Sequence, residues 1–116
     1  MKQEIEIKLE IRNSITIFHM EGDLTAFSEP FLNEAYENAD QQGVSKILLE
    51  FTPEAYINSG GIALLIQLLA QTTKKNQEVA ITGLSSHFQK IFKMVGINKF
   101  AKIYKTIEEA LQDMSG

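Results

Sequence analysis

The sequence of 116 residues contains no cysteine, no tryptophan, two prolines and two histidines. The lack of cysteine excludes disulfide bonds, thiolate catalysis and cysteine-based metal sites, and it fits a reducing cytoplasm. The longest apolar run is far shorter than the roughly 20 residues of a membrane-spanning helix. The N-terminus also lacks the apolar stretch of a secretory signal. We therefore expect a cytoplasmic protein that does not insert into a membrane.

Most sequence signatures of enzymes are also missing. There is no Gly-x-Gly-x-x-Gly, no phosphate-binding loop ending in Gly-Lys-Ser/Thr, and no Gly-x-Ser-x-Gly. Neither His19 nor His87 has an evident serine or carboxylate partner in the order of a catalytic triad. No second histidine or carboxylate lies at metal-ligand spacing from His19. We therefore expect no catalytic residue, no cofactor and no metal. The weakest alternative is a small-molecule enzyme that uses Asp23, Asn58 and Ser59.

The charge is unevenly distributed along the chain. The net charge is −4, with eleven acidic and four basic side chains in residues 1–57, but seven lysines and one glutamate in residues 74–105. An acidic chain binds nucleic acid poorly, so we expect no nucleic-acid partner. The lysine-rich segment is most simply a solvated helix surface, and an acidic partner or a membrane surface is the alternative.

Hydrophobic periodicity predicts an alternation of strands and helices. Strict alternation predicts two paired strands first, and continuous apolar runs predict buried strands later. The predicted strands are 4–11, 15–20, 46–51, 78–82 and 102–104, and the predicted helices are 28–41, 58–75, 86–95 and 106–114. We expect one domain spanning residues 1–116, with an α/β fold of order ββαβαβαβα. Its mixed sheet should carry helices mainly on one side.

Several helix ends are marked by capping residues. Ser28, Asn58 and Ser86 are of the types preferred at the N-cap, where a side-chain oxygen accepts from a free backbone N–H. Gly96 is placed where a helix ends in a left-handed residue. These positions sharpen the helix boundaries.

The segment 57–62, Ile-Asn-Ser-Gly-Gly-Ile, lies where the loop after a buried strand enters a very apolar helix. In open α/β sheets, ligands and partners bind at such positions. A plain helix start would explain Asn58, but each glycine there costs about 0.5–1 kcal/mol relative to alanine. We therefore expect a neighbouring strand or another protein to approach closely. Ser59 would lie in the first turn, where the helix dipole tolerates a phosphate.

At this point the sequence resembles the STAS domain, the family of bacterial anti-sigma-factor antagonists. The family has a strand, a loop and Asp-Ser-Ser/Thr-Gly leading into an apolar helix. Here Asn58-Ser-Gly-Gly61 matches that motif, and Gly22-Asp-Leu-Thr25 resembles the family's Gly-Glu-Leu-Asp. The segments 81–86, 90–97 and 104–111 resemble the rest of the domain, so the resemblance covers nearly the whole chain.

The resemblance implies a partner-switching mechanism. The unphosphorylated domain would bind an anti-sigma factor that is also a serine kinase, and the kinase would phosphorylate the motif serine, which matches Ser59. A serine phosphatase would reverse this. The implied partner-binding surface consists of residues from the two loops: Asp23, Leu24, Thr25, Asn58, Ser59, Gly60 and Gly61.

Three positions depart from the family pattern. Asn58 replaces the motif aspartate, Gly60 replaces the second Ser/Thr, and Thr25 replaces the aspartate of the first loop. An alternative is therefore a constitutive STAS scaffold, or an accessory subunit of a lipid-trafficking ABC transporter or stress complex.

Overall fold

The computed structural model describes residues 4–115, which form one five-stranded sheet in the spatial order β1-β2-β3-β4-β5. β1 and β2 are antiparallel, and each later strand is parallel to its neighbour. The strands are β1 (Glu6–Arg12), β2 (Ile15–Glu21), β3 (Lys46–Glu50), β4 (Glu78–Thr82) and β5 (Lys102–Ile103). The mixed sheet is thus confirmed, with an antiparallel edge strand on a parallel core.

Four α-helices connect and follow these strands. They are α1 (Glu29–Gln41), α2 (Ser59–Lys74), α3 (Ser86–Met94) and α4 (Ile107–Ser115), with short 3₁₀ turns η1 (Ala26–Ser28) and η2 (Ile97–Lys99). The predicted order ββαβαβαβα is therefore confirmed. None of the helices formed by residues 4–115 is long and apolar enough to cross a bilayer.

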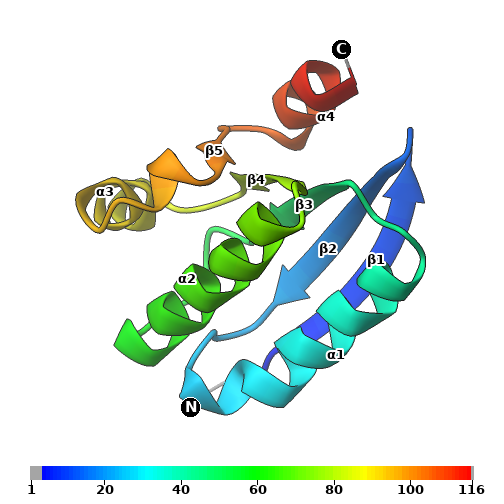
Figure 1. Cartoon of the computed structure of the whole chain (residues 1–116). Coiled ribbons are helices and arrows are strands. Elements are labelled where there is room, and N and C mark those ends of the chain that lie inside the picture. The colour runs from blue at the N-terminus through cyan, green and yellow to red at the C-terminus, as the bar shows by residue number, and fades with distance from the viewer. Residues whose placement is uncertain (1–3, 116) are drawn as a thin grey trace.

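The two faces of the sheet are covered unequally. Side chains alternate between the faces along each strand, so Phe18 and Leu49 are buried with α1, α2 and α3 in the main core. Ile17 and Leu48 point the other way, into a smaller core under α4. Figure 1 shows α1 and α2 side by side over one face of the sheet. The prediction of helices mainly on one side is confirmed.

The predicted helix caps are partly confirmed. Asn58 caps α2, and Gly96 adopts the left-handed conformation with φ 85° after α3. Ser28 precedes α1 but its side chain does not cap the helix, because its hydroxyl accepts from the N–H of Thr25 at 3.0 Å. The prediction for Ser86 was wrong by one residue.

The N-cap of α3 is Ser85, whose extended backbone (φ −61°, ψ 160°) stands just outside the helix. Its Oγ accepts from the N–H of Phe88 at 3.3 Å. Two consecutive serines satisfy the same preference, and only the backbone conformation decides which of them is the cap.

Candidate functional site

The loop after β2 and the loop before α2 are joined by backbone hydrogen bonds. The N–H of Leu24 donates to the carbonyl of Tyr56 at 2.9 Å, and the N–H of Asn58 donates to the carbonyl of Leu24 at 3.2 Å. Leu24 and Ile57 form a parallel bridge of one residue pair. Residues 23–25 and 58–61 therefore form one continuous patch, which we call the two-loop surface.

Asn58 determines where α2 begins. Its backbone is extended, and its Oδ1 accepts from the N–H of Gly61 at 2.9 Å. The carbonyl of Asn58 accepts the first helical bond, from Ile62 at 2.9 Å. Ser59 is therefore the first residue of a 16-residue helix, and it is exposed. An added negative charge at this end of the helix interacts favourably with the helix dipole.

The two glycines after Ser59 are explained by a contact within the chain. A β-carbon on Gly60 would lie 2.9 Å from both the nitrogen and the β-carbon of Ala26, and one on Gly61 would lie 2.7 Å from the carbonyl carbon of Leu24. Both distances are shorter than van der Waals contact. The sequence predicted that a neighbouring strand or another protein approaches these glycines, but neither is needed to explain them. The loop 24–26 supplies the contact.

The seven residues predicted for partner binding differ in their exposure. Ser59 is exposed, whereas Leu24 is fully buried and Gly61 is also buried. Asp23, Thr25, Asn58 and Gly60 are half-buried. The side chain of Leu24 therefore anchors its loop in the core and presents only neighbouring residues to solvent. The assignment of Leu24 and the other six residues to a partner-binding surface stays a prediction.

Thr25 has an internal role. Its Oγ1 accepts from the N–H of Phe27 at 3.1 Å and thereby caps the turn η1. An aspartate at this position, as in the family pattern, could cap the same turn. Thr25 therefore preserves the local structure while it removes one negative charge from the two-loop surface.

Sequence reasoning missed two exposed aromatic residues in the same two loops, Phe27 and Tyr56, which we include in the two-loop surface. Phe27 is 83% exposed and follows Ala26, the residue that contacts Gly60. Tyr56 is 56% exposed and its ring meets that of Phe88 edge to face, with centroids 6.2 Å apart. Exposed aromatic side chains are enriched where proteins bind partners. The sequence feature that could have indicated them is the presence of one aromatic residue in each of the two loops.

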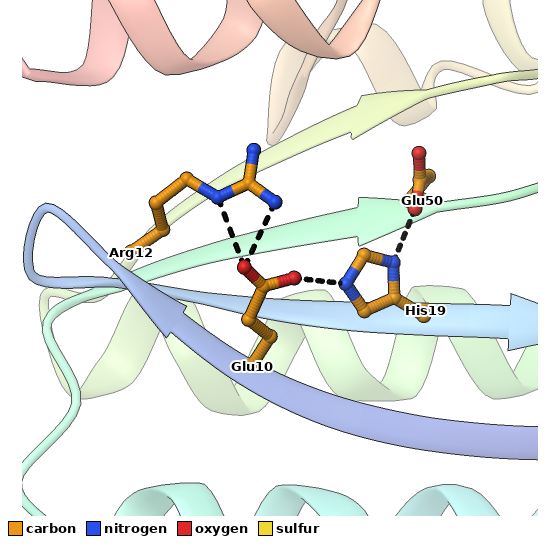
Figure 2. A network of polar contacts seen from close by, with 4 residues as sticks. All are labelled: Glu10, Arg12, His19 and Glu50. Carbon is orange, nitrogen blue, oxygen red and sulfur yellow. Dashed lines mark hydrogen bonds and ion pairs between the residues drawn. The ribbon is translucent and has the colours of Figure 1, made fainter.

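A second polar cluster lies on the opposite face of the sheet, away from α1 and α2 (Figure 2). His19 of β2 hydrogen-bonds Glu50 of β3 through Nδ1 and Glu10 of β1 through Nε2, the latter at 2.7 Å. Arg12 pairs with the other oxygen of Glu10 at 2.8 Å. The sequence did not reveal these two carboxylate partners of His19, because the strand register joins residues far apart in the sequence.

The charges in this cluster shift two pKa values. Burial disfavours the charged form of His19, but the hydrogen bonds to Glu10 and Glu50 outweigh it and raise the pKa of His19. The hydrogen bond from His19, followed by that from Arg12, lowers the pKa of Glu10. The imidazole of His19 therefore links three strands, and the raised pKa shows that the two glutamates favour its protonated form.

Comparison with known proteins gives a consistent result. The model of the STAS domain family matches residues 6–110. The anti-sigma-B factor antagonist of Listeria monocytogenes is 25% identical over 108 residues, which are 93% of each chain.

Solved structures share the fold at low identity. The crystal structure of an anti-sigma factor antagonist from Mycobacterium paratuberculosis has a TM-score of 0.80 at 16% identity, covering 97% of this chain and 95% of that chain. The phosphorylated form of the Bacillus cell fate determinant SpoIIAA has a TM-score of 0.66 at 17% identity, covering 94% and 99%.

Proposed function

Because the chain belongs to the STAS domain family, we propose that it is a regulatory binding protein that antagonises an anti-sigma factor through the two-loop surface. Binding is controlled by phosphorylation of Ser59. The observation that carries this proposal is the position of Ser59, which is exposed at the first turn of α2 and within the patch where the two loops meet. The relative named an anti-sigma-B factor antagonist supports the same role.

Phosphorylation at Ser59 acts on the interface and leaves the fold intact. A phosphoserine adds roughly −1.5 to −2 charges. At the N-terminus of α2 the helix dipole accommodates this charge. In a complex, however, the same charge lies in the patch that holds Phe27 and Tyr56, and covering it by a partner carries a desolvation cost. Phosphorylation therefore releases a partner that covers these aromatic rings.

The partner in this proposal is an anti-sigma factor that is also a serine kinase, and a serine phosphatase restores binding. The test uses the anti-sigma factor kinase of the source organism, purified with this protein and ATP. We expect one added phosphate by mass spectrometry, absent in Ser59→Ala. Ser59→Asp should weaken binding in isothermal calorimetry, whereas Ser59→Ala should bind like the wild type. Equal binding by both variants would contradict the switch.

One observation favours a second candidate, a constitutive STAS scaffold or an accessory subunit of a lipid-trafficking ABC transporter or stress complex. Gly60, which stands where the family has a second hydroxyl, is held against Ala26 by a contact that leaves no room for a side chain. The motif therefore has a single acceptor. Co-purification with an ATPase subunit, unaffected by Ser59→Asp, would support this candidate.

A further inference from the structure

An apolar groove lies between the second half of α2 and the segment that follows α3. One wall is made by Ile66, Ala70 and Thr73 of α2, and the other by Val95, Ile97 and Phe100. The three α2 residues are spaced at i, i+4 and i+7, so they line one stripe of the helix. The enclosed volume is about 220 Å³. No part of the two-loop surface contributes to this groove.

The groove leaves large apolar side chains in water. Ile66 and Val95 are each 47% exposed and Phe100 is 60% exposed, while Met94 beside them is 84% exposed. Gly96, with its left-handed backbone, reverses the chain so that Ile97 enters the core while Val95 stays outside. Covering such surface is favourable because it removes apolar area from water. A cluster of this kind marks an interaction site.

The size of the groove favours a side chain over a small ligand. Pockets for drug-sized ligands and cofactors span roughly 300–1,000 Å³, which exceeds the volume found here. Interfaces instead often place one bulky apolar anchor residue in a small pocket. A groove beside an exposed helix face also suits an amphipathic helix that inserts such an anchor.

The positive charge around the groove favours a partner that carries negative charge. The walls belong to the lysine-rich part of the chain, since residues 74–105 contain seven lysines and one acidic residue, Glu78, which lies beside Lys99 in a neighbouring hollow. The stem of Lys99 lies near Gly96, which lines the groove, with its Cδ 4.0 Å from the position of a β-carbon on Gly96. Lys74 and Lys93 occupy the last turns of α2 and α3. Among residues 4–115 none of these three lysines forms a salt bridge, so their charge is available to a partner.

We propose that this groove docks an acidic amphipathic segment of a partner protein, which places one bulky apolar side chain between Ile66 and Phe100 and its carboxylates on Lys74, Lys93 and Lys99. This goes beyond the proposed function, because Ile66 and Thr73 lie about 10 and 21 Å along α2 from Ser59. Docking here is therefore independent of the phosphorylation state of Ser59.

An anionic membrane and a second copy of the chain are weaker occupants. The whole chain has a net charge of −4, which opposes approach to an extended anionic surface. A short peptide responds mainly to the lysines within about 10 Å, the screening length at 0.1 M salt. A second copy could supply acidic residues and the exposed Phe27 from its N-terminal half, but its docking would then cover the two-loop surface that the proposed function assigns to the anti-sigma factor.

The test uses labelled acidic helical peptides that differ only in the central anchor: leucine, isoleucine, methionine, phenylalanine or tryptophan. The control peptides carry lysine in place of every glutamate. Binding is measured by fluorescence anisotropy, and amide shifts are mapped by NMR. We expect an acidic peptide to bind, with shifts centred on residues 66–73 and 95–100. The basic controls should not bind.

The variants separate the groove from the rest of α2. Ile66→Glu and Lys99→Glu should weaken peptide binding by about tenfold or more. Gln67→Glu adds the same charge at a neighbouring exposed position outside the groove. This control variant should keep more of the wild-type peptide affinity than Ile66→Glu does. Ser59→Asp should leave peptide binding unchanged even where it abolishes binding of the anti-sigma factor. Circular dichroism confirms that each variant is folded.

Several outcomes would overturn the proposal. The groove does not dock an acidic segment if no peptide of the set binds, if acidic and basic peptides bind equally, or if the shifts map elsewhere. Binding to phosphatidylglycerol vesicles without binding to peptide identifies a membrane surface instead. If the protein dimerises in sedimentation experiments and Ile66→Glu abolishes the dimer, the occupant of the groove is a second copy of the chain.

Discussion

The carbonyl group of Leu24 occupies the space that a β-carbon on Gly61 would need, since the carbonyl carbon lies 2.7 Å from that position. The contact fixes the loop after β2 against the first turn of α2. It therefore determines the relative position of Ser59 and the loop residues around it.

Gly61→Ala should destabilise the protein by about 1–3 kcal/mol, because the new methyl group forces backbone atoms apart. The substitution would otherwise favour the helix by about 1 kcal/mol, so the sign of the change is diagnostic. Urea unfolding measures the effect. Ser59→Ala, in the same turn but exposed, is the control and should change the free energy of unfolding by less than about 0.5 kcal/mol. A Gly61→Ala variant as stable as the wild type would contradict the contact.

A negative charge at Ser59 should not destabilise the free protein. Ser59→Asp places a carboxylate in the first turn of α2, where the dipole contributes about 0.3–1 kcal/mol at low salt. Thr73→Asp places the same charge in the last turn of the helix and should destabilise by a similar amount. The two free energies of unfolding are compared at low and high salt, which should reduce both effects. If Ser59→Asp unfolds the protein, a switch acts on the fold and not on the interface.

Phe27→Ala should weaken binding of the anti-sigma factor without affecting stability. The ring is 83% exposed, so its removal should change the free energy of unfolding by less than about 0.5 kcal/mol. Truncating an aromatic anchor of an interface commonly costs more than about 1 kcal/mol of binding. The matched control is Phe31→Ala, because Phe31 is 40% exposed but faces the groove between β1 and α1. Calorimetric titration of both variants with the same partner decides whether the two-loop surface carries the interaction.

The link between His19 and its two glutamates should make stability depend on pH. The folded state raises the pKa of His19, so the stabilisation is fully present below the ordinary histidine pKa of about 6.5 and is lost as the pH rises through the folded value. The lowered pKa of Glu10 gives stability that is present above the ordinary glutamate pKa of about 4.3 and is lost as the pH falls through the folded value. The cluster should therefore stabilise most between these two ordinary values.

NMR titration of the imidazole protons measures the pKa of His19 directly, and a His87→Gln variant assigns the signals. We expect a value above 6.5, the ordinary histidine value, and a lower value in Glu50→Gln, which removes one charged acceptor. His19→Gln should reduce stability more at pH 5.5 than at pH 8. A titration that Glu50→Gln leaves unchanged would refute the link across β2 and β3.

Much of the fold could be predicted because its signals are local. Alternation in residues 4–11 and the helical stripe after Asn58 depend only on neighbouring residues, and they predicted the order of strands and helices. Asn58 and Gly96 marked helix ends correctly because each acts on backbone groups within a few residues. Ser85 and Ser86 were confused, since both have the same side chain and differ only in backbone conformation.

The sequence by itself determined the element order and the placement of Ser59 at a helix start, because hydrophobic periodicity and capping depend on short segments. The motifs around Asn58 and Gly22 carried the resemblance to the family. Only the tertiary structure decided which groups meet across long separations. The register of three strands brings Glu10 and Glu50 to His19, and the folding of one loop onto another buries Leu24 and accounts for Gly61. Such contacts depend on strand pairing and packing in three dimensions, which no local pattern encodes.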